Sequence, residues 1–238
     1  MEMRKEKETP QLSAENTKFG FTGETLVLEN GPTLYRIVAL RDFGDIKKGT
    51  PGGFIESEKN LDFKSDAWIA GNAKVYDHAE VSGNAKVYGN AEVFNSAKVY
   101  GNAKVFGYAK VYGNANIYGR ALVFENAEVY SNAEVFGYAK VYGNANIYDH
   151  AKVYDYVDVY DDALVLGHAW IYGNAQVFDN AKVYGNAQVS GNAKVYGDAE
   201  VSENYNFRHQ EQLRTYLILH KKMIEKLNEI EKKNLLRN

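Results

Sequence analysis

Residues 101–119 read GNAKVFGYAKVYGNANIYG, and this stretch decides the fold because it repeats one six-residue unit three times. The same unit, Asn-Ala-x-Val-Tyr-Gly in its commonest form, fills residues 66–203 as 23 units without insertion or deletion. Its second position is Ala in every unit except the one that holds Val157, and its fourth position is Val or Ile throughout. Self-similarity at a fixed period predicts a repeat architecture.

Within one unit, Ala, x and Val alternate, which predicts a short strand with Ala and Val on one side and x on the other. Gly at the sixth position and Asn at the first tolerate a positive φ and therefore predict a turn. Such a short strand in every unit has no returning strand with which to form a hairpin. We therefore expect each strand to pair with its equivalent in the next coil of a solenoid.

The charges at the x position indicate how many units make one coil. If three units close a coil, one face stacks Lys74, Glu92 and Lys110, whose signs alternate, whereas two units per coil would stack Lys74 on Lys86. Like charges directly opposite each other are destabilising, so the sequence predicts three units per coil, with every eighteenth side chain in register, even though Lys86 then lies on Lys104. Three short faces would enclose Ala and Val, which makes an all-β, triangular, single-stranded parallel solenoid.

The Val-x-x-x-Ala-x spacing of the unit resembles the hexapeptide-repeat left-handed β-helix family, and this resemblance implies a left-handed winding. The upstream residues LYRIVALRDF (34–43), GGFIE (52–56) and Asn60-Leu61 are similar to the front end of YdcK-like proteins described as transferases and of prophage-associated hexapeptide-repeat proteins. The resemblance covers about residues 18–203. It implies a prophage-associated protein whose partner is a host protein, such as a defence or regulatory component.

The pattern divides the chain into four segments. Residues 1–17 are expected to be a flexible N-terminus, 18–60 an N-terminal β cap with a hairpin at Asn30-Gly31, 61–203 the β-helix, and 204–238 a C-terminal amphipathic α-helix. Leu61 is expected to open the first coil in the register of the Ala positions. The C-terminal helix would either cap the solenoid or mediate assembly or partner binding. Its apolar stripe comprises Leu213, Leu217, Ile224 and Leu227.

The fifth position is Tyr or Phe in 18 of the 23 units, which predicts aromatic ladders such as the one from Tyr88 to Tyr160. The ladders would shield and stabilise the coil edges, or offer an adhesive surface to a protein. The repeat is disturbed over 156–172, where large apolar side chains occupy outward positions. In addition, an Arg and two Tyr at equivalent positions of successive coils predict a cation–π stack. The predicted binding residues are Arg120, Tyr138, Tyr156, Leu164, Leu166 and Trp170.

Three histidines share the first position of the unit, and spacings that are multiples of 18 place His78, His150 and His168 on one corner, with Asp149 beside the last two. In the acyltransferases that the repeat resembles, a histidine acts as general base at a cleft between neighbouring subunits of a trimer. If the chain is an acyl-CoA-dependent acyltransferase acting as a trimer, His150 and His168 are its candidate bases. No loop leaves the repeat to shape a donor site, so a histidine that merely replaces the turn Asn is the other interpretation.

Composition excludes several classes of function. The net charge of −3 argues against a globally basic nucleic-acid binder, and the absence of cysteine excludes disulfides and thiolate metal sites. Because there is no apolar run long enough to span a bilayer and no secretory leader, we expect a cytoplasmic protein that does not enter a membrane. We expect neither a cofactor nor a metal. The leading hypothesis is a non-catalytic solenoid scaffold that binds a protein and forms a homo-oligomer, either a dimer or a trimer.

Overall fold

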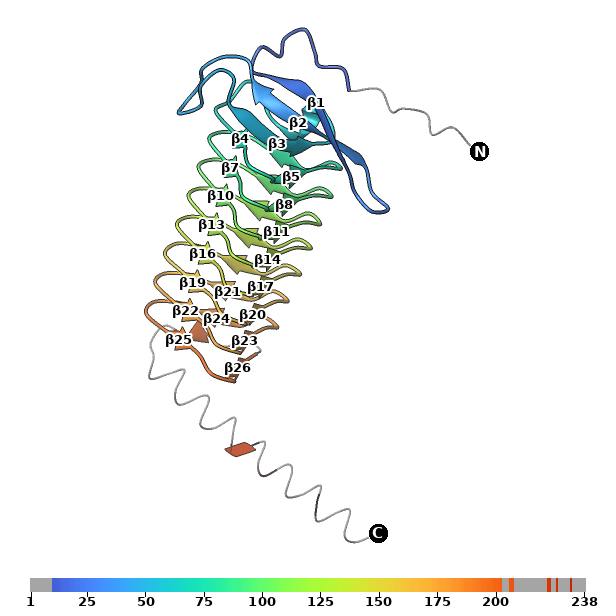
Figure 1. Ribbon diagram of the computed structural model, residues 1–238. Helices are drawn as coiled ribbons and strands as arrows, with labels where there is room; N and C mark the ends of the chain where they lie inside the picture. Colours follow the sequence, from blue (N-terminus) through green and yellow to red (C-terminus); the bar gives the residue numbers. More distant parts are fainter. Residues whose placement is uncertain (1–9, 203–205, 208–221, 224–225, 227–231, 233–238) are drawn as a thin grey trace, which may run out of the picture.

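The computed structural model describes residues 10–202 and 206–207, together with Lys222, Met223, Lys226 and Lys232 in a helical conformation. Short strands recur in every unit of the repeat and stack into a column of about eight turns (Figure 1). The apolar stripe predicted for the C-terminal helix, which comprises Leu213, Leu217, Ile224 and Leu227, lies outside the described residues.

Three parallel sheets enclose the column, and consecutive strands of the repeat belong to successive sheets. We call them face 1, face 2 and face 3 in the order in which the chain visits them after β4. Face 1 continues into the N-terminal strands and consists of β1 (Phe19–Val27), β2 (Thr33–Ala39), β3 (Pro51–Ile55), β5 (Lys74–Val75), β8 (Glu92–Val93), β11 (Lys110–Val111), β14 (Glu128–Val129), β17 (Asn146–Ile147), β20 (Leu164–Val165), β23 (Lys182–Val183) and β26 (Glu200–Val201).

Faces 2 and 3 have eight strands each. Face 2 consists of β6 (Glu80–Val81), β9 (Lys98–Val99), β12 (Asn116–Ile117), β15 (Glu134–Val135), β18 (Lys152–Val153), β21 (Trp170–Ile171), β24 (Gln188–Val189) and β27 (Asn206–Phe207). Face 3 consists of β4 (Trp68–Ile69), β7 (Lys86–Val87), β10 (Lys104–Val105), β13 (Leu122–Val123), β16 (Lys140–Val141), β19 (Asp158–Val159), β22 (Gln176–Val177) and β25 (Lys194–Val195).

Every eighteenth residue of the repeat comes into register, which confirms the predicted coil length. Lys110, for example, lies opposite Glu92 on one side and Glu128 on the other. The predicted like-charge contact is also present, because Lys86 pairs with Lys104 on face 3. The left-handed winding and the triangular cross-section stay predictions.

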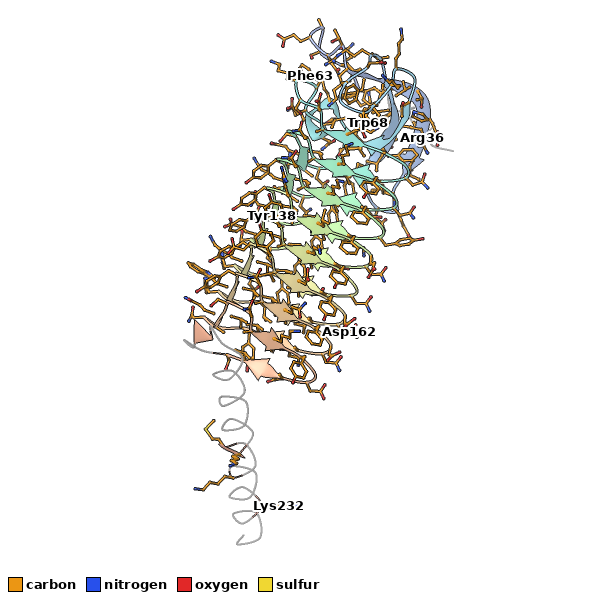
Figure 2. The ribbon with its side chains drawn as sticks, turned by 90° about the vertical axis from the view of Figure 1, so that its left-hand side faces the viewer. Arg36, Phe63, Trp68, Tyr138, Asp162 and Lys232 are labelled. Carbon is orange, nitrogen blue, oxygen red and sulfur yellow. The ribbon has the colours of Figure 1, made fainter. Side chains whose placement is uncertain are left out.

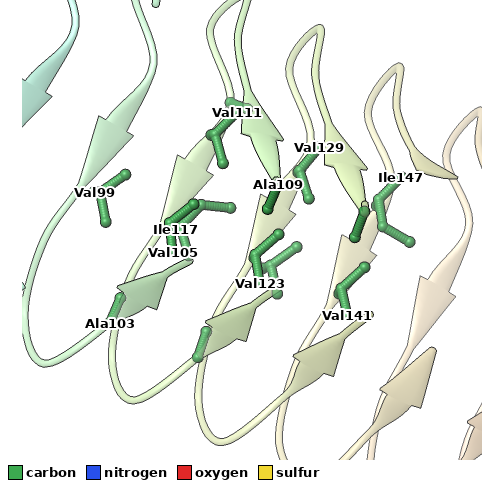
Figure 3. Packing of buried hydrophobic residues seen from close by; sticks show 14 of the residues in the cluster. Val99, Ala103, Val105, Ala109, Val111, Ile117, Val123, Val129, Val141 and Ile147 are labelled. Atoms are coloured by element: carbon green, nitrogen blue, oxygen red, sulfur yellow. The ribbon is translucent and has the colours of Figure 1, made fainter. Parts of the chain in front are cut away.

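The core is a column of small and branched apolar side chains. Val and Ile at the fourth position have no exposed surface, and the same holds for Ala at the second position from Ala67 to Ala193 (Figure 3). Val157, which replaces Ala, is equally buried. Each buried Val stabilises the fold by about 1.5–3 kcal/mol relative to an exposed one, so the repeat supplies a large hydrophobic term in spite of its short strands.

The turns differ from the prediction in one respect. Within the described repeat, positive φ is confined to the sixth position of the unit, where Gly or one of its Asp, Asn, Glu and Ser replacements adopts it, as Gly119 does at +70°. Asn at the first position does not adopt a positive φ. Its preference for this turn therefore does not come from its tolerance of the left-handed region. The strands contain only x and Val, because Ala already belongs to the turn.

The N-terminal cap contains the predicted hairpin, since β1 and β2 pair antiparallel around Asn30. β3 then pairs in parallel with β5, and η1 (Glu58–Asn60) leads into the first coil. The register predicted for Leu61 was wrong. Leu61 forms a β-bridge with Val81. In the regular repeat, the residue opposite Val81 would be Phe63, which lies 18 positions before it. Leu61 therefore occupies a Val position, and the corner that follows it contains two extra residues.

A buried lysine holds this longer corner. The Lys18 ammonium donates hydrogen bonds to the carbonyl oxygens of Asp62 at 2.8 Å and Ala67 at 2.6 Å. It also lies 4.8 Å from the centre of the Phe43 ring. Burial lowers the pKa of Lys18 to about 8, against the opposing effect of Asp62. At the other end of the column, β27 pairs with β24, so face 2 extends beyond the boundary predicted at 203.

Candidate functional site

The predicted aromatic ladders are present on all three faces. Neighbouring rings are nearly parallel, and their centres lie 4.7–5.4 Å apart. The longest ladder borders face 3 and has seven rings, those of Tyr88, Phe106, Phe124, Tyr142, Tyr160, Phe178 and Tyr196. Because each ring face lies against the next ring, a ladder presents ring edges to solvent, and it cannot stack sugars or bases along its length.

Some ladder tyrosines are tied to the neighbouring column of charges. The Tyr112 hydroxyl donates to Glu128 at 2.9 Å, and the Tyr118 hydroxyl donates to Glu134 at 3.0 Å. Burial, followed by these hydrogen bonds, raises the pKa of both tyrosines. Burial likewise raises the pKa of Tyr76 and of Tyr142 to about 12. Burial therefore favours the protonated form of these four ladder tyrosines.

A second kind of aromatic stack occupies the corner between faces 2 and 3. The Arg120 guanidinium lies 5.4 Å from the centre of the Tyr138 ring, and the Tyr138 and Tyr156 rings are stacked at 4.9 Å. This arrangement brings together the three residues whose spacing predicted a stack. Tyr138 is 45% exposed and Tyr156 is 62% exposed, whereas the ladder rings are half-buried except Tyr196, which is 53% exposed at the C-terminal end of its ladder.

The other predicted binding residues do not form one surface. Leu164 lies on face 1 between Asn146 and Lys182, whereas Trp170 lies on face 2 between Lys152 and Gln188. Leu166 occupies the corner between them. Both leucines are half-buried, but Trp170 is 41% exposed, with the Lys152 ammonium 5.9 Å from its ring.

Two of the three histidines form a stacked pair. The rings of His150 and His168 lie 4.9 Å apart and nearly parallel on the corner between faces 1 and 2. The Asp149 carboxylate instead accepts a hydrogen bond from the Gly167 backbone N–H at 3.2 Å. In the part of the chain that the structure describes, no group of three His, Asp or Glu residues is placed to hold a metal ion.

Sequence reasoning missed two features. Tyr108 is 64% exposed on the corner between faces 3 and 1, and the signal that could have found it is the replacement of Asn at the first position, as for Tyr138. A shallow groove of about 270 Å³ also lies beside β6, between Leu61, Phe63 and Val81. It results from the longer first corner, whose two extra residues no repeat pattern reveals.

The fold and the repeat define a parallel β-solenoid protein. A family model for the YdcK β-solenoid repeat matches residues 187–203, so this part of the chain is similar to the YdcK-like β-solenoid repeats. No curated protein matches the chain. Among the described residues, no helix has the length and apolar character needed to cross a membrane.

Proposed function

We propose that this chain is a non-catalytic β-solenoid scaffold that binds a protein through the corner between faces 2 and 3. The observation that carries the proposal is the exposed stack of Arg120, Tyr138 and Tyr156. Elsewhere in the described repeat the first position mostly holds Asn, and most large rings lie half-buried in ladders, apart from Tyr108 and Tyr196. Tyr, Trp and Arg are the residue types that most often anchor protein interfaces, so their exposure together on one corner supports a contact surface.

Trp170 extends the proposed surface onto face 2. Its ring is exposed on an otherwise polar face, and it lies on the coil that follows Tyr156. Leu164 and Leu166 lie on face 1 and its corner with face 2 and are half-buried, so we assign them a smaller contribution. An isolated exposed Leu is ordinary, whereas a group of exposed rings indicates a contact.

The resemblance to prophage-associated proteins supports a host protein, such as a defence or regulatory component, as the partner in the cytoplasm. The acyltransferase alternative would require a cleft at His150 or His168. The groove beside β6 contains neither residue, and the histidine pair lies on an outer corner of the column. The geometry therefore favours protein binding over acyl transfer.

The proposal is tested by changing the exposed rings together. Tyr138→Ser, Tyr156→Ser and Trp170→Gln in one variant should remove any protein that the unchanged chain retains from host extract, as identified by mass spectrometry. Tyr108→Ser, an exposed tyrosine on another corner, is the matched control and should retain it. Circular dichroism would establish that the variants remain folded. Equal recovery of the same protein by the triple variant and the unchanged chain would refute the proposed surface.

A further inference from the structure

Most lysines of the repeat form ion pairs within the fold. Seven lysines of the described repeat each pair with an acidic side chain, namely Lys74, Lys86, Lys98, Lys110, Lys140, Lys152 and Lys182. Lys104 and Arg120 are exposed and form no ion pair with any residue that the structure describes. Lys104 lies opposite Leu122 on the adjacent strand, and Arg120 precedes Leu122 by two residues. These two cations are therefore neighbours, on face 3 and on its corner with face 2.

Two carboxylates that lie against face 3 are already shared among its lysines. Asp45 of the cap binds Lys86. The hydrogen bond from Lys86, and to a smaller extent the charge of Lys104, lower the pKa of Asp45. Asp158 lies 3.7 Å from Lys140. Two carboxylates thus face three lysines, and this part of the face keeps an excess of positive charge.

Other acidic residues beside face 3 lie on its opposite border or further along the column. Glu125 and Asp162 belong to the corner between faces 3 and 1, and Figure 2 shows Asp162 on the opposite side of the column from Tyr138. Asp155 lies on the corner between faces 2 and 3, one coil beyond Tyr138, and its carboxylate accepts a hydrogen bond from the Gly173 backbone N–H. This corner is therefore basic where the two cations lie and acquires negative charge only further along the column.

Apolar side chains lie beside the two cations. Leu122 occupies the outward x position between Lys104 and Lys140, where it is half-buried. The Arg120 guanidinium lies against the Tyr138 ring, and its N–H groups donate no hydrogen bond to a described residue. A guanidinium can bind a carboxylate through two parallel hydrogen bonds while its flat face contacts an aromatic ring. The corner thus presents cations first and exposed rings next along the column.

We propose that this corner binds an extended acidic segment of the partner protein, whose carboxylates pair with Lys104 and Arg120 and whose apolar side chain packs on Tyr156. The inference rests on the proposed function, because it assigns a chemistry to the partner of the same corner. Tyr156 lies two coils beyond Arg120, which is about 10 Å at a strand spacing of about 4.8 Å. An extended chain covers this distance in about three residues, so the partner's acidic and apolar residues should have that spacing.

A nucleic acid fits this corner less well. Its negative charges continue along the whole strand, so they would extend from the cations onto Asp155 and Asp158. The Tyr138 and Tyr156 rings are stacked on each other at 4.9 Å, and a base cannot enter between them. A peptide can instead confine its carboxylates to one end and its apolar side chain to the other.

Two synthetic peptides with capped ends test the inference. The acidic probe is Glu-Asp-Glu-Ser-Ser-Phe-Gly, and the neutral probe is Gln-Asn-Gln-Ser-Ser-Phe-Gly. Fluorescence anisotropy of an uncharged dye on each peptide measures its binding to the full chain. We expect the acidic probe to bind with a Kd below about 1 mM, and the neutral probe to bind about tenfold more weakly. Raising the salt concentration should weaken the binding of the acidic probe.

Variants that lack two cations provide the matched comparison. Lys104→Gln with Arg120→Gln should weaken the binding of the acidic probe about tenfold, because two ion pairs are lost. Lys110→Gln with Lys182→Gln removes the same net charge from face 1 and should leave the affinity unchanged. No binding up to about 1 mM, equal binding of the two probes, or equal losses in the two variants would overturn the inference. So would a DNA oligonucleotide that binds the chain more tightly than the acidic probe.

The protein retained from host extract separates this inference from the proposed function. If it is lost when Tyr138, Tyr156 and Trp170 are changed, but kept by Lys104→Gln with Arg120→Gln at low and at raised salt, the proposed function stands and the acidic segment is wrong. If both variants lose it and raised salt releases it from the unchanged chain, both proposals are supported. Equal recovery when the three rings are changed would refute the proposed surface itself, and this inference with it.

Discussion

At the scale of single residues, hydrogen bonds between neighbouring coils explain why Gly can be replaced at the sixth position of the repeat. Eight residues other than Gly adopt a positive φ within the described repeat, and seven of them accept a hydrogen bond from the backbone N–H at the equivalent position of the next coil. Asp155, for example, accepts from Gly173 at 3.1 Å. The side chain thus compensates for the left-handed backbone by satisfying a donor of the next coil.

Substitution of Gly119 tests this compensation. Gly119 has a φ of +70°, and a Cβ there would approach the Gly137 nitrogen to 2.9 Å. Gly119→Ala should lower the free energy of unfolding by about 2 kcal/mol or more. Gly119→Asp should lower it less, by about 1 kcal/mol, because its carboxylate can accept the Gly137 N–H. Urea denaturation measures both changes.

Gly197→Ala separates the two costs, since its φ is also positive but no atom of the residues that the structure describes lies within 4 Å of the added Cβ. Gly197→Ala should lose only the stability that the positive φ costs a residue with a Cβ. Its free energy of unfolding should therefore decrease less than that of Gly119→Ala. A Gly119→Asp variant no more stable than Gly119→Ala would show that the hydrogen bond does not compensate.

At the scale of elements, the ladders make stability depend on alkaline pH. Tyr76 and Tyr142 have a pKa of about 12 in the folded chain because they are buried, against 10 when unperturbed. The folded state therefore retains protons that the unfolded state loses between pH 10 and 12. The contribution of these tyrosines is complete below pH 10 and decreases as the pH rises toward 12.

Replacing the two phenols tests this dependence. Tyr76→Phe with Tyr142→Phe should leave urea stability near its original value at neutral pH, because both rings already stack on phenylalanine neighbours. Between pH 10 and 12 the variant should be more stable than the unchanged chain. Phe124→Tyr in the same ladder is the converse control, which should lose more stability at high pH. Identical pH profiles for all three proteins would contradict the role of burial.

The elements also show which features the sequence determines. The coil of three units is predictable because only that spacing alternates Lys110 with its neighbours, and the stack of Arg120, Tyr138 and Tyr156 follows from the same spacing. The separation of Leu164 from Trp170 follows as well, since one unit leads to the next face. The first corner is not predictable, because its register depends on Lys18, which lies 44 residues before the Asp62 carbonyl that it binds.

At the scale of the whole molecule, each coil contacts mainly the coils before and after it. Every described strand of the repeat pairs with the equivalent strand of an adjacent coil, so stability should be close to a sum of coil and interface terms. Such a molecule should tolerate the loss of a complete coil, provided that the new neighbours are compatible in charge and size.

Removing residues 127–144 meets that condition. It brings Asn146 next to Lys110 on face 1, Lys152 next to Asn116 on face 2, and Asp158 next to Leu122 on face 3, so no like charges meet at the x positions of the three faces. The shortened chain should keep its β circular dichroism and unfold cooperatively, with a lower melting temperature and a smaller denaturant m value because less surface is buried.

Removing residues 127–135 is the matched comparison, because a deletion of one and a half units breaks the register of the repeat. Phe136 would then occupy the buried position of Ala127, which has no exposed surface, and a core packed from Ala and Val cannot admit a phenyl ring without displacing its neighbours. This half-length deletion should therefore destabilise the protein more than the deletion of a whole coil, although it removes half as much of the chain. If the shorter deletion were the better tolerated, stability would depend on the length of the column more than on its register.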